Sequence, residues 1–245
     1  RETRKLIVAK NVSKSLGGKQ LFKGVDVTLA PGTRLGVVGN NGTGKTTLMK
    51  VLAGKIPQDL GTLKCADELK IVYFDQHREH IPPEITLRHA LSPTSDMVNY
   101  RGQSIHVNGW AKKFLFSPER MGLPVSCLSG GERARILIAK LMLEPADVLF
   151  LDEPTNDLDI PTLEVMEESL KEFAGAVVLI SHDRCLMDRV CTQILGLGMN
   201  NEHQFFADYS QWEQACEPII VPEKEVKLQS KPASAAKTKK LSYHE

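Results

Sequence analysis

The chain has 245 residues, of which 42% are hydrophobic and 25% are charged, and its formal net charge is +1. This is the composition of a globular protein with room for a sizeable core, and the small net charge gives no overall footprint for nucleic acid. The apolar runs are shorter than the roughly 18 residues that cross a bilayer, so we expect no membrane insertion.

The first third of the chain is predicted to consist mostly of strands. Residues 5–14 are apolar and β-branched, residues 21–30 alternate between apolar and polar side chains, and turn signals follow both. Residues 33–39 predict a short buried strand, and residues 46–54 predict a helix closed by its last glycine. Residues 61–76 predict two further strands.

The rest of the chain changes in character twice. Residues 77–145 begin with a polar, proline-containing stretch that has helical pieces, so we expect a small helical insert there. From residue 130, helices alternate with apolar strands, which predicts a parallel sheet covered by helices. Residues 193–208 predict a hairpin that turns at Asn200-Asn201.

The C-terminal tail differs from the domain that we expect over residues 1–217. Residues 218–245 contain six lysines and three glutamates with few large apolar side chains. This composition predicts a flexible linker, and a solvated linker is a simpler explanation of the lysines than contact with nucleic acid. Because the chain lacks an initiator Met and a signal peptide, we expect it to be a piece of a longer protein.

The cysteines and histidines give no sign of a metal site or a disulfide scaffold. The cysteines form no C-x-x-C pair and fit reduced thiols in a cytoplasmic protein; they are Cys65, Cys127, Cys185, Cys191 and Cys216. His77, His80 and His89 lie in an irregular polar stretch, where several histidines are common without a metal.

A glycine-rich loop follows the strand predicted over residues 33–39 and precedes a helix. It fits the pattern G-x-x-x-x-G-K-[ST], in which backbone N–H groups and a helix N-terminus hold phosphates and the lysine reaches the β and γ phosphates. A chance glycine turn would not also have this strand and helix around it. The residues expected to hold a nucleoside triphosphate are Gly39, Asn40, Asn41, Gly42, Thr43, Gly44, Lys45, Thr46 and Thr47.

A second candidate for the phosphate site is the end of an apolar strand, VLFLDEPTNDLD at residues 148–159. Asp152 is placed to hold Mg²⁺ through water, and Glu153 is placed to orient or deprotonate an attacking water. A strand that simply ends in surface carboxylates would have the same sequence, so the functional interpretation depends on the glycine loop upstream.

The order of the motifs resembles that of the ATP-binding cassette (ABC) family. LSGGERAR at residues 128–135 opens another helix with a Ser-Gly-Gly turn, between the glycine loop and Asp152. Gln76 follows an earlier strand, and His182 ends a later one. The resemblance covers residues 5–215 and implies a P-loop NTPase fold of the α/β class, with a mostly parallel core sheet, an antiparallel β subdomain and a small helical subdomain.

The resemblance also implies a role for each matching residue. Residues 39–47 match the Walker A loop, and Asp152 with Glu153 matches the Walker B pair. Catalytic roles fall to Glu153, His182 and Gln76, and contacts with Mg²⁺ fall to Thr46, Gln76 and Asp152. The signature turn, Ser129, Gly130 and Gly131, would close over ATP held by a facing second cassette. The D-loop would span Asn156 to Asp159.

One position departs from the family pattern. Where the family usually has an aromatic residue that stacks on adenine, this sequence has Leu16. A missing stack weakens ATP binding or relaxes base choice, because base–aromatic stacking contributes about 1–3 kcal/mol in proteins that bind single strands. Phe22 lies on the opposite parity to Val25 and could substitute, or it could make a local packing contact.

Three details resemble the ABC-F group, the cassettes without a membrane domain. They are the TN dipeptide at residues 155–156, the run FLFSPERMGLPVSCLSGGERAR, and FFADYSQWEQA followed by a lysine-rich stretch. The last of these is similar to the Uup-type branch, whose members carry two cassettes and often a C-terminal coiled coil. The resemblance implies that this is the second cassette, with ribosomes or branched DNA as partners of the full-length protein.

Three functions remain open from the sequence. The first is a cytoplasmic ABC-F ATPase that drives conformational change on a ribosome or nucleic acid, weak in turnover as an isolated cassette. The second is the ATPase subunit of a membrane transporter. The third is a non-hydrolytic ATP-gated clamp, which the intact Glu153 and His182 disfavour. Trp110 and Phe114, four residues apart, are expected to be helix-core residues.

Overall fold

The structure is a computed structural model that describes residues 4–74, 81–155, 158–199 and 202–216. Its strands are β1 (Ile7–Leu16), β2 (Lys19–Leu29), β3 (Arg34–Val38), β4 (Leu60–Cys65), β5 (Ile71–Phe74), β6 (Met97–Tyr100), β7 (Gln103–His106), β8 (Val148–Asp152), β9 (Ala176–Ile180), β10 (Gln193–Met199) and β11 (Glu202–Phe206). Its helices are α1 (Lys45–Leu52), α2 (Leu87–Leu91), α3 (Val107–Lys113), the short 3₁₀ turns η1 (Pro118–Arg120) and η2 (Val125–Cys127), α4 (Gly130–Leu141), α5 (Ile160–Glu172), α6 (Arg184–Val190) and α7 (Tyr209–Cys216).

A six-stranded sheet in the order β11-β10-β3-β9-β8-β5 forms the centre of the molecule. The strands from β10 to β5 are parallel, whereas β11 pairs antiparallel with β10. Leu149 and Leu151 of β8 belong to the core on one face, and Val148 and Phe150 belong to the core on the other. A parallel strand buried on both faces is a continuous apolar run, which confirms the predicted helix-covered sheet.

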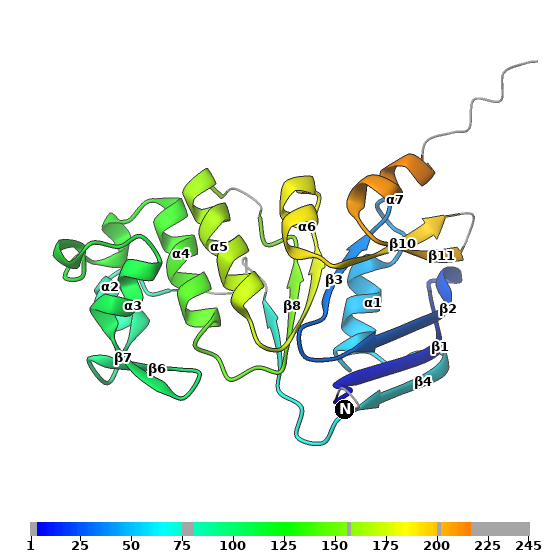
Figure 1. Cartoon of the computed structure of the whole chain (residues 1–245), viewed down its shortest axis with the longest axis horizontal. Helices are drawn as coiled ribbons and strands as arrows, with labels where there is room; N and C mark the ends of the chain where they lie inside the picture. Colours follow the sequence, from blue (N-terminus) through cyan, green and yellow to red (C-terminus); the bar gives the residue numbers. More distant parts are fainter. Residues whose placement is uncertain (1–3, 75–80, 156–157, 200–201, 217–245) are drawn as a thin grey trace, which may run out of the picture.

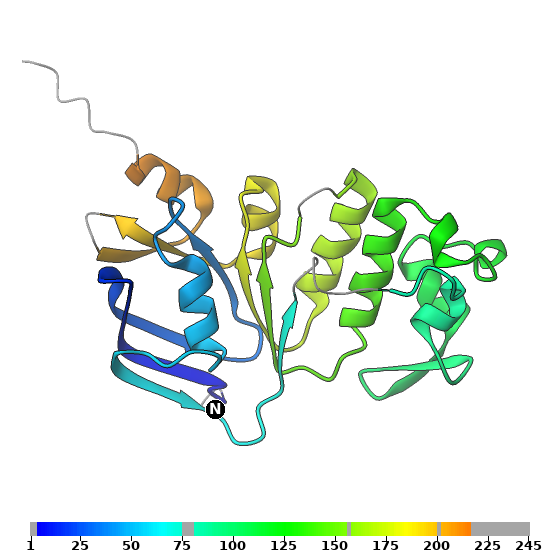
Figure 2. The same cartoon turned by 180° about the vertical axis from the view of Figure 1, so that it is seen from behind.

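Different layers cover the two faces of this sheet (Figures 1 and 2). On one face lies a core shared by α4, α5 and α6, which continues into the helical part of the chain. On the other face α1 lies between the central sheet and a three-stranded antiparallel sheet in the order β2-β1-β4. The predicted strands over residues 5–14 and 21–30 are confirmed in this smaller sheet, and residues 61–76 supply one strand to each sheet.

The helical part forms one end of the molecule and packs around buried aromatic side chains. Trp110 is 1% exposed and Phe114 is 3% exposed, which confirms both as core residues. The hairpin of β6 and β7 was not predicted from sequence, where a helical insert was expected. It turns at Arg101 and Gly102, which both have positive φ, the backbone of a type I′ turn.

Candidate functional site

The glycine loop joins β3 to α1, and two of its positions accept no larger residue. At Gly39, where φ is 144°, a Cβ atom would lie 2.6 Å from the carbonyl oxygen of Leu197. At Gly44, where φ is 94°, a Cβ atom would lie 2.8 Å from Cβ of Leu21. Glycine therefore brings the loop close to β10 at one end and to β2 at the other, and the loop leads directly into the first turn of α1.

Lys45 is the first residue of α1, and its side chain folds back under the loop. Its ammonium donates to the carbonyl oxygens of Gly39 at 2.7 Å and Asn40 at 3.2 Å. Burial lowers the pKa of Lys45, and the nearby carboxylates of Glu153 and Asp152 oppose that shift. The ammonium thus lies between the loop backbone and two acidic side chains.

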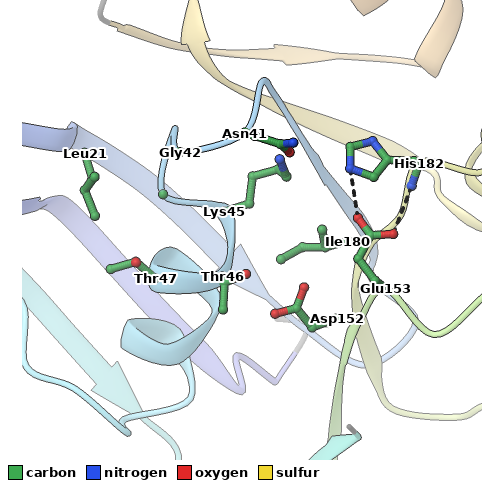
Figure 3. A pocket seen from close by; sticks show the side chains of 11 residues that line it. Leu21, Asn41, Gly42, Lys45, Thr46, Thr47, Asp152, Glu153, Ile180 and His182 are labelled. Atoms are coloured by element: carbon green, nitrogen blue, oxygen red, sulfur yellow. Dashed lines mark hydrogen bonds and ion pairs between the residues drawn. The ribbon is translucent and has the colours of Figure 1, made fainter. Parts of the chain in front are cut away.

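These groups line a cavity of about 400 Å³ beside the loop (Figure 3). Its walls come from the loop and α1, from the carboxyl ends of β8 and β9, and from β2. In an open parallel sheet this edge is where ligands bind. The lining residues are Leu21, Asn41, Gly42, Gly44, Lys45, Thr46, Thr47, Asp152, Glu153, Ile180 and His182.

Asp152 ends β8 and is oriented by the neighbouring strand β5. The hydroxyl of Tyr73 donates to Oδ2 of Asp152 at 3.1 Å. The ammonium of Lys55 lies over the Tyr73 ring, 3.8 Å from its centroid, and Phe150 stacks against the ring with centroids 6.3 Å apart. Tyr73 is therefore held by contacts of its own while it fixes one carboxylate oxygen.

Glu153 is held against His182 by its backbone as well as by its side chain. Its φ of 50° is in the left-handed region, and its N–H donates to the carbonyl oxygen of Ile180 at 2.9 Å. Its Oε2 accepts from the backbone N–H of His182 at 3.3 Å, and its Oε1 lies 3.3 Å from Nε2 of that histidine. The turn after β8 thus places the Glu153 carboxylate beside the imidazole (Figure 3).

The residues of the cavity fit a magnesium-bound nucleotide. Among the described lining residues, Asp152 and Glu153 supply two carboxylates, whereas Lys45 supplies one ammonium. A divalent cation would offset this excess of negative charge, and the Thr46 hydroxyl and Asp152 carboxylate are the hard oxygen donors that Mg²⁺ prefers. The described residues contain no cluster of three or more His, Cys, Asp or Glu suited to a metal.

The Ser-Gly-Gly turn lies outside this cavity, at the start of α4. Ser129 and Glu132 form a capping box, because the Ser129 side chain accepts from the Glu132 N–H and the Glu132 side chain accepts from the Ser129 N–H. A Cβ atom at Gly131 would collide with the carboxylate of Asp159, the N-cap of α5. The turn is therefore fixed to α5, while Gly130 has open space around it.

The adenine side of the site differs from the sequence interpretation. Leu16 is 53% exposed and is not among the residues that line the cavity, whereas Leu21, which was not predicted, does line it. Phe22 is 5% exposed and packs in the core, which favours the packing alternative over stacking on a base. The reason is a bulge at Gly24, with φ of 66°, that reverses the parity of β2.

Some predicted residues lie outside the part of the chain that the structure describes. They include Gln76, Asn156, the histidines at positions 77 and 80, the turn predicted at Asn200-Asn201 and the linker predicted over residues 218–245. Tyr73 is a contributor that sequence reasoning missed, although its place on β5 beside the strand of Asp152 was a usable signal.

A model of the ABC transporter family matches residues 22–156, which is more than half of the chain. The chain belongs to the ABC transporter family. The matched segment of this ABC cassette contains the glycine loop, the Ser-Gly-Gly turn and the strand that ends in Asp152.

Curated relatives place this ABC cassette near the ABC-F proteins, which confirms the predicted resemblance to the Uup-type branch. ATP-binding protein Uup of Haemophilus influenzae is 39% identical over 96% of this chain and 39% of its own length. Uup of Escherichia coli is 36% identical over 95% of this chain and 38% of its own length. The energy-dependent translational throttle protein EttA of H. influenzae is 34% identical over 86% of this chain and 38% of its own length. The chain thus spans about two fifths of the length of these relatives.

Solved structures agree on the fold. The ATP-binding subunit of an ABC transporter superposes with a TM-score of 0.62 at 18% identity, covering 85% of this chain and 92% of the other. The predicted ABC cassette fold is therefore confirmed, while identity at this level shows the fold alone. No helix within the described residues is long and apolar enough to cross a membrane.

Proposed function

We propose that this cassette binds and hydrolyses ATP with Mg²⁺ at the cavity beside α1. The observation that carries the proposal is the meeting of Lys45, Asp152 and the Glu153–His182 pair around one cavity, at the carboxyl edge of the parallel sheet. Lys45 lies more than 100 positions before Asp152, Glu153 and His182 in the sequence, and a chance glycine turn would not gather them.

The glycine loop and α1 hold the phosphates in this proposal. Backbone N–H groups of the loop face the phosphate oxygens, and Lys45 exchanges its contacts with the carbonyls of Gly39 and Asn40 for contacts with the β and γ phosphates. Thr46 and Asp152 hold the magnesium side, and Gln76 is assigned there by its match to the family motif alone. When bound, Mg²⁺ neutralises charge on the β and γ oxygens.

In this proposal, Glu153 and His182 contact the attacking water and the γ-phosphate. The Glu153 carboxylate accepts a hydrogen bond from the attacking water and receives its proton, and the imidazole of His182 donates to the γ-phosphate. The 3.3 Å contact between Nε2 of His182 and Oε1 of Glu153 keeps the two groups in one place before ATP arrives. Positioning of this kind supplies most of the catalysis in phosphoryl transfer.

The macromolecule on which ATP hydrolysis acts is proposed from the relatives. The name of EttA ties that relative to translation, so we propose a ribosome or nucleic acid as the partner of the full-length, cytoplasmic protein. A second cassette, in the same chain or in a dimer, would supply its Ser129-Gly130-Gly131 turn to complete the site. We retain residues 1–217 as the ATPase domain, with a helical insert over residues 77–145, and residues 218–245 as a linker toward a coiled coil.

The test is Glu153→Gln, which removes the proton acceptor and leaves Asp152 in place. The variant should bind MgATP like the wild type in calorimetry and lose at least about a hundredfold in phosphate release, since general-base catalysis contributes about 10²–10⁴-fold. Glu164→Gln, on the exposed side of α5, is the matched control and should keep full turnover. Equal turnover by Glu153→Gln would remove Glu153 from the mechanism, and a wild type that binds ATP without turnover would favour the clamp.

A further inference from the structure

The near-neutral net charge of the chain conceals a strong separation of charge. Residues 4–70 carry twelve Lys and Arg against four Asp and Glu, a balance of +8. Residues 81–216 carry eleven against nineteen, a balance of −8. The three-stranded sheet lies at one end of the molecule and the helical part at the other, whereas β10, β11 and α7 of the acidic segment lie at the same end as the three-stranded sheet (Figure 1).

The three-stranded sheet carries part of this positive charge, because β1, β2 and β4 together contain five lysines and one aspartate. Val8 of β1 pairs with Thr28 of β2 and with Lys64 of β4, and paired residues in antiparallel strands share a face. Lys10, two residues after Val8, lies on the same face and pairs with Thr62. We call this set, Val8, Lys10, Asp26, Thr28, Thr62 and Lys64, the basic face.

The basic face is exposed to solvent, and its two lysines form no ion pair within the described residues. Ile7 and Ala9, on the opposite side of β1, are buried in the core, whereas Lys10 and Lys64 are exposed. Within the described part of the chain neither lysine has a carboxylate within ion-pairing distance. Asp26 accepts the backbone N–H of Asn11 at 2.8 Å and keeps its negative charge, so the basic face carries two positive charges and one negative charge.

We propose that the basic face binds the phosphate backbone of a nucleic acid. Lysine ammonium groups and threonine hydroxyls on a flat surface are the groups that contact phosphate oxygens in such complexes. The described side chains of this face include no aromatic residue, so there is no platform on which unpaired bases stack. We therefore expect binding to a duplex that is independent of sequence and strongly dependent on salt.

Two other functions of this positive charge, membrane binding and the steering of ATP, fit these observations less well than nucleic-acid binding. Proteins usually bind an anionic membrane surface with an amphipathic helix that inserts aromatic or leucine side chains, whereas this face is part of a sheet and consists mainly of lysine and threonine. Steering of ATP toward Lys45 is a rate effect that needs charge near the cavity, whereas none of the six residues of the basic face lines it.

This inference rests on the proposed nucleic-acid partner and assigns the surface that meets it. The experiment measures the fluorescence anisotropy of labelled DNA and RNA duplexes titrated with the full chain, between about 50 and 200 mM KCl. The variant is Lys10→Gln with Lys64→Gln. The matched control is Lys112→Gln with Lys140→Gln, which removes the same charge from the acidic segment.

The wild type should bind both duplexes. The ratio of its affinities for the RNA duplex and the DNA duplex shows which nucleic acid the face prefers. The basic-face variant should lower the slope of log Kd against log salt by about 2, since each neutralised phosphate contributes about 0.9, and weaken binding at least tenfold at the lowest salt. The control variant should change the salt slope and the affinity at the lowest salt much less. All three proteins should bind MgATP equally.

The outcomes distinguish failure of the proposed nucleic-acid partner from failure of the proposed binding surface. If the wild type binds neither duplex, the nucleic-acid partner and the basic face both fail, while ATP binding still stands. If the wild type binds and both variants behave alike, only the basic face is wrong. Loss of binding to phosphatidylserine vesicles, without loss of duplex binding, would assign the face to a membrane. Concentration-dependent self-association that the basic-face variant abolishes, again without loss of duplex binding, would assign it to the acidic segment of another copy.

Discussion

At the residue scale, the loop lysine makes two hydrogen bonds that phosphate oxygens could replace. The Lys45 ammonium donates to two loop carbonyls and faces Asp152 and Glu153 across the cavity. Lys45→Ala should weaken MgATP binding by at least about tenfold, because hydrogen bonds to charged groups contribute about 1.5–3 kcal/mol each. Titration calorimetry measures the change, with Lys50→Ala on the exposed side of α1 as the control. An unchanged affinity would mean that residues 39–47 do not hold phosphates.

Tyr73 provides a second prediction at this scale. Tyr73→Phe removes only the hydroxyl that donates to Asp152 and keeps the ring between Lys55 and Phe150. The Mg²⁺ concentration that half-saturates nucleotide binding should rise about three- to tenfold, since one hydrogen bond contributes about 0.5–1.5 kcal/mol. Binding of ATP in the presence of a chelator should stay the same. Tyr100→Phe, in the helical part, is the control, and an equal Mg²⁺ requirement for both variants would assign Tyr73 to packing alone.

Side chains within sequence motifs were predictable, and side chains placed by a local irregularity were not. Lys45, Asp152, Glu153 and His182 meet as expected because each follows a strand of the same parallel sheet. Phe22 lies inside the core because one extra residue in β2 shifts the alternation. A bulge of this kind leaves only a glycine as its signal, and glycine has many other uses.

At the element scale, a buried arginine fastens α5 to the central sheet. Arg34, at the start of β3, is 6% exposed and donates to the carbonyl oxygens of Leu170 at 3.0 Å and Gly175 at 2.8 Å, and also to that of Phe173. The cation thus caps the C-terminus of α5, where the carbonyl groups lack partners within the helix.

Removing this cap should destabilise the fold without touching the ATP site. Arg34→Met removes the donor to the carbonyl groups of Leu170 and Phe173, whereas that of Gly175 still accepts the N–H of Gly32. An unpaired buried carbonyl costs about 1–3 kcal/mol, so we expect a loss of about 2–4 kcal/mol in the free energy of unfolding. Urea denaturation followed by circular dichroism measures it. Arg101→Met, at the exposed hairpin turn, should cost much less, and an equal loss in both variants would contradict the capping role.

Elements were predictable where their sequence pattern was long and were missed where it was short. The alternation from residue 130 to 190 is clear because the strands are apolar on both faces and the helices have polar outer faces. The strands β6 and β7 have four residues each, too few to establish a period of two. The helix α7 lies within the domain expected over residues 1–217 but was not predicted as a helix; it has eight residues, and none of them is buried.

At the scale of the whole molecule, the two proposed phosphate-binding features lie apart from each other. The glycine loop opens onto the cavity beside α1, whereas the Ser129 turn begins α4, beyond α5 and α6 in both views (Figures 1 and 2). Ser129, Gly130 and Gly131 are not among the residues that line the cavity. In the proposed arrangement of two cassettes, the Ser-Gly-Gly turn of a facing cassette would close this cavity.

Turnover by this chain should accordingly depend on the meeting of two cassettes. We expect slow hydrolysis whose rate rises faster than linearly with protein concentration, and an ATP-dependent dimer of Glu153→Gln in light scattering. Ser129→Arg puts bulk and charge at the turn and should abolish that dimer with MgATP affinity unchanged. Ser129→Asn keeps a side chain able to cap α4 and should retain the dimer. Full turnover by a monomer that is indifferent to Ser129→Arg would contradict a site built from two surfaces.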